Sequence, residues 1–158
     1  MTAIPLPASG VLDGAIHRYA LRVYYEDTDA GGIVYHANYL RWFERARSDL
    51  LDLLDIDQAA ALIAGEGAYT VAEVSLRYLV PARLGDTVNL ETRAEAIGRA
   101  SCNMRQIAWR GDTKLAEATV RVGFVGPDGR PRRQPEAWQR AFTAFTDASP
   151  ASPPEGQE

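Results

Sequence analysis

Three carboxylate side chains crowd one short loop, Glu26, Asp27 and Asp29. Two adjacent glycines, Gly31 and Gly32, follow after one intervening residue. A carboxylate beside a bound substrate can act as a general base or as a nucleophile, and paired glycines let the backbone approach a ligand without side-chain obstruction. Ordinary turn formation would also account for this composition. Both interpretations remain open from the loop alone.

The residues after the glycines favour hydrolysis. An aromatic, histidine-bearing stretch from Tyr35 to Tyr39 leads into a helical pattern. The first turn of a helix offers free N–H groups and the positive end of the dipole, which stabilise developing negative charge. A carboxylate beside such a site is what ester or thioester cleavage needs. The chain has no G-x-S-x-G motif and no Ser-His-Asp order, so serine hydrolase chemistry is disfavoured.

The hydrophobic pattern changes along the chain in an order that predicts two packed layers. Alternation from His17 to Tyr25 predicts a strand, and apolar residues three and four apart from Asn38 to Leu54 predict a long helix. Four further runs alternate with period two, and Pro135 begins a short final helix. The fold class is therefore α+β, with one long helix against a five-stranded antiparallel sheet. The four later runs cover residues 68–80, 87–97, 101–109 and 115–125.

Strict alternation also fixes which side chains share a face. In the run 68–80, one face is expected to carry Thr70, Ala72, Val74, Leu76 and Tyr78. Cys102, on the apolar side of its strand, is expected to pack in the core. His17 opens the first strand and is expected at the surface.

Composition and charge limit the functional class. The net charge is −4, and a duplex-binding surface would normally show a basic excess, so we expect no nucleic-acid partner. The single cysteine excludes an internal disulfide and a C-x-x-C site. Without a signal-like start or a long apolar run, we expect a cytoplasmic protein with no stable membrane insertion. Residues 1–15 are expected to form a flexible arm, 16–146 the domain and 147–158 a disordered tail.

One long block of sequence points to a known family. The stretch YEDTDAGGIVYHANYLRWFERAR closely resembles the signature of the 4-hydroxybenzoyl-CoA thioesterase family, nearest to the YbgC-like acyl-CoA thioesterases associated with the Tol-Pal system. The resemblance continues more weakly through YLVPARLGD and covers about residues 17–135. It implies the hotdog fold, in which the sheet wraps one central helix. It also implies hydrolysis of a short, medium-chain or aromatic acyl-CoA to the free acid and CoA.

The resemblance assigns roles to individual residues. Asp29 matches the catalytic aspartate of T-D-x-x-G, acting as nucleophile or general base. Tyr25 matches an aromatic position at the end of the first strand that faces the site. His36 matches the position whose backbone N–H polarises the thioester carbonyl, and its imidazole adds a contact to substrate. Gly32 and Val34 shape the loop.

Further assignments concern substrate binding. Tyr35 lines the same junction, and Arg99, after Gly98, lies near where family members place basic side chains against the CoA phosphates. Arg132 and Arg133 are the next candidates for that contact. A second hotdog branch takes its carboxylate from inside the helix, where Glu44 is the candidate, but that branch has H-G-G before the helix and this chain has A-G-G. No metal or organic cofactor is implied, because water is the second reactant.

Three alternatives share this fold. An acyl-carrier-protein thioesterase would keep Asp29 and bind an acidic protein partner. A non-catalytic binding subunit of a cell-envelope or lipid-synthesis assembly is disfavoured by the intact T-D-x-x-G-x-V-Y-H run. A dehydratase would need its histidine in a different motif. In each case an open sheet edge predicts a homo-oligomer, a dimer or a dimer of dimers, formed by pairing the second strands of the five predicted ones.

Overall fold

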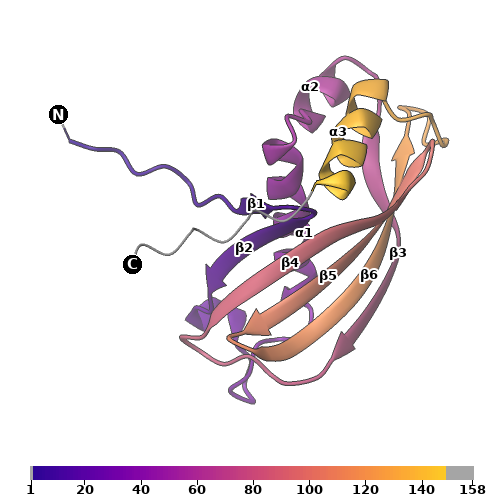
Figure 1. Cartoon of the computed structure of the whole chain (residues 1–158). Helices are drawn as coiled ribbons and strands as arrows, with labels where there is room; N and C mark the ends of the chain where they lie inside the picture. Colours follow the sequence, from indigo (N-terminus) through magenta and orange to yellow (C-terminus); the bar gives the residue numbers. More distant parts are fainter. Residues whose placement is uncertain (1, 149–158) are drawn as a thin grey trace, which may run out of the picture.

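The computed structural model describes residues 2–148. A six-stranded antiparallel sheet in the order β1-β2-β4-β5-β6-β3 curves around the long helix α1, as Figure 1 shows. The strands are β1 (Val11–Asp13), β2 (Ile16–Arg22), β3 (Ala68–Tyr78), β4 (Thr87–Ile97), β5 (Ser101–Arg110) and β6 (Thr113–Val125). The helices are the 3-10 turn η1 (Tyr25–Asp27), α1 (Asn38–Leu53), α2 (Gln58–Ile63) and α3 (Glu136–Asp147). The predicted α+β class is confirmed, and none of the described helices is long and apolar enough to cross a membrane.

The sheet has one strand more than the sequence predicted. Strand β1 pairs with β2 through Val11–Arg18 and Asp13–Ile16, and it lies inside the segment 1–15 that was expected to be a flexible arm. Three residues are too few for alternation to be recognised. At the other end, α3 runs to Asp147, one residue beyond the expected domain boundary. The expected disordered tail lies, from residue 149 onward, outside the described residues.

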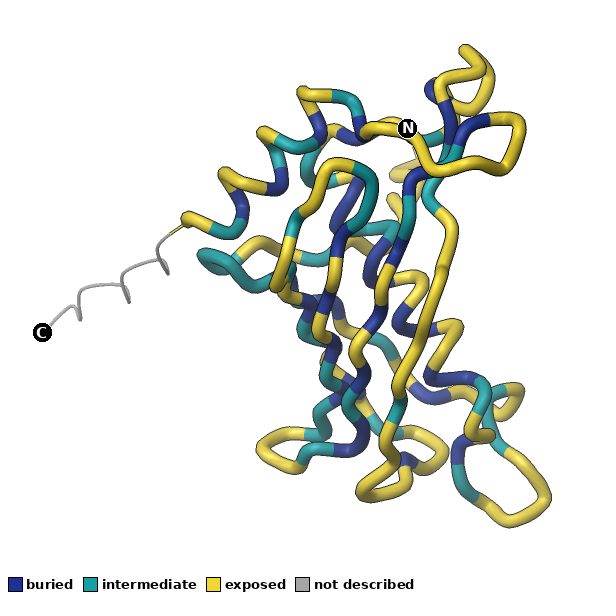
Figure 2. The backbone as a smooth tube through the Cα atoms, turned by 90° about the vertical axis from the view of Figure 1, so that its right-hand side faces the viewer, coloured by how far each residue is buried: buried dark blue, intermediate teal, exposed yellow. Residues whose placement is uncertain are grey.

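Helix α1 supplies the centre of the core. The predicted stripe is confirmed, because Phe43, Ala46 and Leu50 are almost fully buried against the inner face of the sheet. Along β4, β5 and β6 buried and exposed residues alternate, so one face packs on the helix and the other meets solvent, which Figure 2 shows along the tube. Cys102 is buried as predicted.

Strand β3 departs from strict alternation. A β-bulge shifts its register against β6 between Val71 and Glu73, so that Ala72 is an extra residue. Residues directly opposite each other in an antiparallel pair share a face. The inward face of β3 therefore carries the partners of the buried β6 residues, namely Tyr69, Val71, Val74, Leu76 and Tyr78. The prediction was wrong for Thr70 and Ala72, because the sequence gives no sign of the bulge.

Helix α3 closes the upper end of the core. Pro135 is the N-cap and not the first helical residue, and its fixed backbone angle starts the helix without a side-chain cap. The ring of Trp138 lies 5.6 Å from that of Tyr69 and 5.5 Å from that of Phe124. Phe142 is fully buried beneath them. The final helix thus covers the sheet of its own chain.

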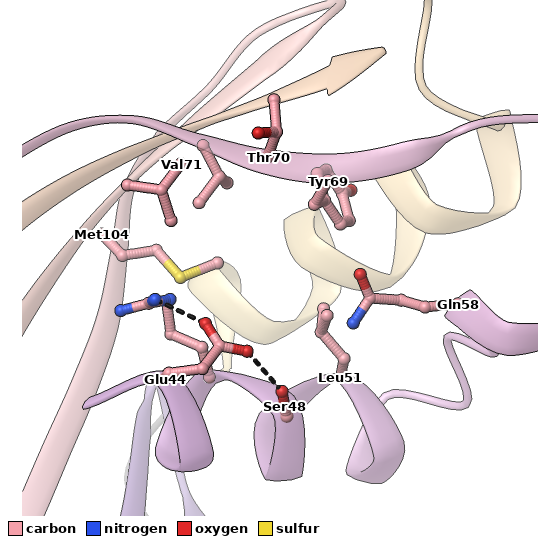
Figure 3. A pocket seen from close by; sticks show the side chains of 10 residues that line it. Glu44, Ser48, Leu51, Gln58, Tyr69, Thr70, Val71 and Met104 are labelled. Atoms are coloured by element: carbon pink, nitrogen blue, oxygen red, sulfur yellow. Dashed lines mark hydrogen bonds and ion pairs between the residues drawn. The ribbon is translucent and has the colours of Figure 1, made fainter. Parts of the chain in front are cut away.

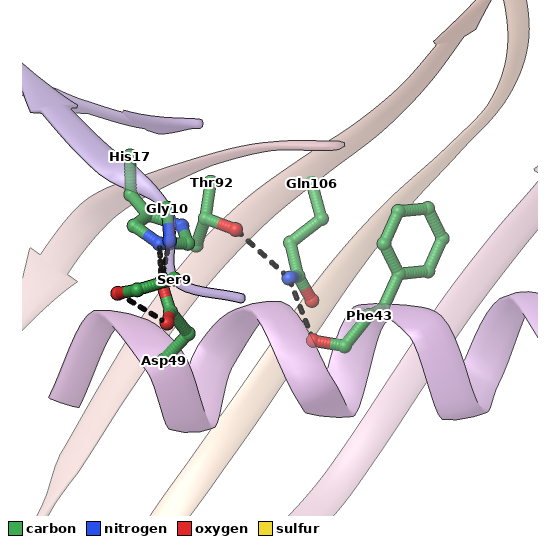
Figure 4. A network of polar contacts seen from close by, with 7 residues as sticks. All are labelled: Ser9, Gly10, His17, Phe43, Asp49, Thr92 and Gln106. Carbon is green, nitrogen blue, oxygen red and sulfur yellow. Dashed lines mark hydrogen bonds and ion pairs between the residues drawn. The ribbon is translucent and has the colours of Figure 1, made fainter. Parts of the chain in front are cut away.

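His17 was predicted at the surface, and the structure contradicts this. Its side chain is fully buried, and its Nε2 lies 2.7 Å from Oδ2 of Asp49 on α1 (Figure 4). The same carboxylate accepts hydrogen bonds from the backbone N–H of Gly10 at 2.8 Å and the hydroxyl of Ser9 at 2.9 Å. Within residues 2–148, Nδ1 of His17 is buried without a partner. Asp49 therefore fastens both β2 and the segment before β1 to the central helix.

Burial of His17 gives the fold a dependence on pH. Desolvation lowers the pKa of His17 below its ordinary value of 6.5, and the contact with Asp49 only partly offsets this. The unfolded chain therefore takes up the proton first as pH falls, so stability is fully present above about pH 6.5 and declines below it. We expect a smaller free energy of unfolding at about pH 6 than at about pH 7.5. Carboxylates stay ionised at both pH values, so their titration does not contribute to this difference.

Urea titrations at the two pH values measure this difference. His17→Gln, which keeps a nitrogen able to donate to Asp49, should reduce the pH dependence. The matched control is His36→Gln, because His36 is the chain's one other histidine and is exposed. An equal pH dependence in wild type and His17→Gln would contradict the assignment.

Candidate active site

The loop between β2 and α1 is held in shape by Asp27. Its carboxylate accepts a hydrogen bond from the Tyr24 N–H at 2.8 Å and from the Asn38 side-chain amide at 3.1 Å. Its backbone carbonyl accepts from the Tyr35 N–H at 2.9 Å. Asp27 thus joins the end of β2 to the first residue of α1. Among the three loop carboxylates it has a structural role, which loop composition did not distinguish.

Asp29 lies at the exposed turn of the same loop. Its Oδ1 accepts a hydrogen bond from the Gly31 N–H at 2.8 Å, and its backbone carbonyl accepts from the Gly32 N–H at 3.0 Å. Gly32 has a φ of 78°, a conformation that favours glycine. Among residues 2–148 no hydrogen-bond donor reaches Oδ2 of Asp29. The turn therefore orients the carboxylate through one oxygen and leaves the other available.

An open hollow of about 550 Å³ surrounds this carboxylate. Its walls include Tyr25, Asp29 and Gly32 from the loop and Leu84 from the segment after β3. Tyr25 does not lie at the end of the first strand as predicted, because β2 ends at Arg22 and Tyr25 begins the turn η1. Its side chain, 83% exposed, still reaches the same hollow as Asp29.

A second hollow of about 230 Å³ lies at the start of α1. Val34 and His36 line it, with Tyr78 at the end of β3 and the apolar segment 79–81. The buried Val34 donates its N–H to the Ala82 carbonyl at 2.9 Å, which fixes the loop to the segment after β3. Tyr35 is exposed, with its ring centroid 4.6 Å from that of His36. Among the predicted residues of the loop, Tyr25, Asp29 and Gly32 thus line the first hollow. Val34 and His36 line the second, and Tyr35 lines neither.

The helix start leaves donors available. The Asn38 N–H donates to the Tyr35 carbonyl and the Leu40 N–H to the Ala37 carbonyl. Within the described part of the chain, the N–H groups of His36 and Ala37 have no acceptor. Free N–H groups at the positive end of a helix are suited to an oxygen that gains negative charge.

Arg99 is not brought to these hollows. It lies in the hairpin after β4, whereas the Asp29 loop lies beside the beginning of β4, where the Val23 N–H donates to the Asp86 carbonyl. An eleven-residue strand spans roughly 30 Å at about 3.3 Å per residue. Within one subunit, Arg99 and Asp29 therefore lie at opposite ends of the sheet.

Glu44, the alternative carboxylate, lies at the mouth of a smaller cavity of about 60 Å³ between α1 and β3 (Figure 3). Its Oε2 lies 2.6 Å from Nη2 of Arg47, and its Oε1 accepts from the Ser48 hydroxyl at 2.8 Å. Arg47 is buried and also donates to Gln106 at 2.8 Å. Both carboxylate oxygens of Glu44 are therefore engaged, one by the buried Arg47 cation and the other by the Ser48 hydroxyl.

Two features of the site were missed from the sequence. Leu84 lines the same hollow as Asp29, because the segment YLVPARLGD returns beside the loop. The sequence pointed to this segment only through its resemblance to the thioesterase family. The role of Asp27 depends on bonds to both ends of the loop. Among residues 2–148, no group of three or more His, Cys, Asp or Glu side chains could hold a metal ion.

Comparison with known proteins agrees with this architecture. Residues 31–117 match the thioesterase superfamily, 4HBT. The acyl-CoA thioesterase YbgC of Haemophilus influenzae is 41% identical over 68% of this chain and 79% of its own. A probable thioesterase from Bartonella henselae has a similar structure, with a TM-score of 0.73 and 31% identity over 77% of this chain and 100% of its own. A Thermus thermophilus thioesterase, solved with coenzyme A and Zn, has a TM-score of 0.70 and 28% identity over 82% of this chain and 93% of its own. The chain belongs to the thioesterase superfamily and is a hotdog-fold acyl-CoA thioesterase.

Proposed function

We propose that the protein hydrolyses short, medium-chain or aromatic acyl-CoA with Asp29 as the catalytic carboxylate. The observation that carries this proposal is the contrast between two carboxylates. Asp29 keeps one oxygen without a donor among residues 2–148, in an open hollow of the loop that precedes α1. Glu44 has both oxygens engaged by Arg47 and Ser48.

Two routes are compatible with this position. As a general base, Asp29 takes a proton from water while the water oxygen attacks the thioester carbon. As a nucleophile, it forms a mixed anhydride and releases the CoA thiolate, and water then hydrolyses the anhydride. In both routes the carbonyl oxygen gains negative charge, which the free N–H groups of His36 and Ala37 can stabilise. The products in both cases are the free acid and CoA.

A dimer would complete the site. Strand β3 lies at the edge of the sheet, and its side chains are largely exposed. Val71, Val74 and Tyr78 are 47%, 38% and 48% exposed, although each lies on the inward face. An open edge with apolar side chains is a pairing surface. Antiparallel pairing of two β3 edges would give one continuous sheet with two-fold symmetry.

The same symmetry gives Arg99 a route to the substrate. Antiparallel pairing would set the hairpin end of one subunit beside the Asp29 end of the other. The Gln134 N–H donates to the Arg99 carbonyl at 2.7 Å, so Arg99 lies beside the loop that carries Arg133. Arg132 donates instead to the carbonyls of Gly65 and Glu66. The CoA phosphates would thus bind to the partner subunit's basic hairpin and loop, despite the net charge of −4.

The carboxylate assignment predicts opposite results for two substitutions. Asp29→Asn keeps size and polarity but removes the charge that both routes use, and kcat should fall by about a hundredfold or more. Glu44→Gln should keep kcat within a few-fold and lower the melting temperature, because Arg47 loses its carboxylate partner. Steady-state kinetics and thermal unfolding of both variants test this. A folded Asp29→Asn enzyme with normal kcat, beside an inactive Glu44→Gln, would transfer the role to Glu44.

The pairing surface predicts the oligomeric state. Light scattering should show a dimer, or a dimer of dimers, at micromolar concentration. The double substitution Val71→Lys/Val74→Lys should dissociate it and reduce activity, because it places charge in the pairing edge. Val11→Lys is the matched control, since Val11 is 60% exposed on β1 at the opposite edge. A stable, fully active wild-type monomer would contradict the dimer.

The phosphate contact predicts a change in KM alone. Arg99→Ala should raise KM for acyl-CoA by about tenfold or more, the value of one lost charge-assisted hydrogen bond, with little change in kcat. Hydrolysis of a short thioester that lacks the nucleotide should be unaffected. Arg93→Ala, at an exposed arginine within β4, is the control. Equal losses with both substrates would make Arg99 structural.

A further inference from the structure

Tyr78 bridges the edge strand and the start of the central helix. It is the last residue of β3, and its hydroxyl donates a hydrogen bond to the backbone carbonyl of His36 at 2.7 Å. The two residues are 42 positions apart in the chain. About half of the Tyr78 side chain is exposed, so this contact is not a by-product of core packing.

The helix itself does not use the His36 carbonyl. The N–H groups of Asn38 and Leu40 donate to the carbonyls of Tyr35 and Ala37, on either side of it. The Tyr78 hydroxyl therefore satisfies an acceptor that would otherwise face the hollow at the helix start. Without that bond the peptide between His36 and Ala37 could rotate, because no other hydrogen bond among residues 2–148 holds its carbonyl or its N–H.

The ring of Tyr78 is itself held in place. Its centroid lies 5.4 Å from that of Tyr39, at 76°, and 6.2 Å from that of His36, at 88°. Tyr39 is buried, and its hydroxyl accepts the Ala82 N–H at 3.1 Å. Edge-to-face rings of this kind attract each other and resist sliding. Desolvation, with Tyr39 nearby, raises the pKa of Tyr78, so its hydroxyl remains a donor at neutral pH.

The peptide that Tyr78 holds is part of the proposed oxyanion site. One peptide unit contains the His36 carbonyl and the Ala37 N–H. A hydrogen bond to the carbonyl fixes the plane of the unit and polarises the N–H at its other side. The donors of such a site contribute most when their direction is fixed before the reaction begins.

We propose that Tyr78 is a positioning residue for thioester hydrolysis, whose hydroxyl fixes the His36–Ala37 peptide so that the N–H groups at the start of α1 face the substrate carbonyl. This proposal rests on the proposed function of the same site. It adds a residue from the edge strand, where we place the subunit contact. Subunit pairing and the geometry of the helix start would thus depend on the same strand.

Tyr78→Phe tests the hydroxyl while retaining the ring contacts. We expect kcat to fall about tenfold, the rate equivalent of one hydrogen bond, with KM for acyl-CoA changed by less than about twofold. The matched control is Tyr69→Phe at the other end of β3, whose hydroxyl bonds to the Gln134 side chain near α3. That variant should lose thermal stability and keep kcat. Equal kcat for Tyr78→Phe and wild type would overturn the proposal.

Infrared spectroscopy separates positioning from a merely structural effect. Acyl-CoA bound to Asp29→Asn should show a carbonyl stretch shifted to lower frequency by the N–H donors, and the shift should shrink in Asp29→Asn/Tyr78→Phe. An unchanged shift would overturn the proposal even if kcat fell. If wild type is active, Asp29→Asn is inactive and the shift is unchanged, only the role of Tyr78 is wrong. If wild type hydrolyses no acyl-CoA, the proposed function and this inference are both wrong.

Discussion

The loop before the central helix exposes the carboxylate of Asp29 and must still hold its own backbone in place. Asp27 meets this requirement, because its side chain and carbonyl bind the end of β2 and the first turn of α1 together. An exposed loop without such bonds would sample many conformations, and each ordered residue costs about 1–2 kcal/mol of conformational entropy. With the ends joined, three local hydrogen bonds hold the tight turn around Asp29 and Gly32, and Asp29 takes part in each of them. Of these two aspartates of the loop, Asp27 therefore orders the backbone, and the carboxylate of Asp29 remains available.

The remainder of the domain places this loop at one end of a long sheet. The basic hairpin with Arg99 lies at the other end, and the exposed edge strand β3 runs between them. An acyl-CoA substrate likewise has two unlike ends, an acyl group and a highly charged nucleotide. Within a single subunit, the Asp29 loop and the Arg99 hairpin lie too far apart to contact the two ends of such a substrate. Antiparallel pairing would bring the loop of one subunit beside the hairpin of the other. In the proposed dimer, assembly and substrate recognition would thus depend on the same geometry.

Much of this arrangement could be predicted from sequence because it depends on local periodicity. The α1 stripe around Phe43 and Leu50, the four later strands and the apolar face of α3 all follow from spacings of two, three and four. What failed depends on residues distant in the chain. The burial of His17 follows from Asp49, on the helix 32 positions later. Tyr25 was placed on a strand because alternation continued past Arg22, although the loop bonds made by Asp27 end the strand there.

The bulge at Ala72 has a consequence that concerns parity. Tyr69 and Tyr78 are an odd number of positions apart, so on a regular strand their side chains would point to opposite faces. The bulge corrects this by taking Ala72 out of the alternation, and both rings turn inward, one toward Trp138 of α3 and the other toward His36. The bulge therefore counts for more than the chemical character of the residue at position 72. A regular strand of the same length would have to turn one tyrosine outward and could no longer serve both ends of the domain.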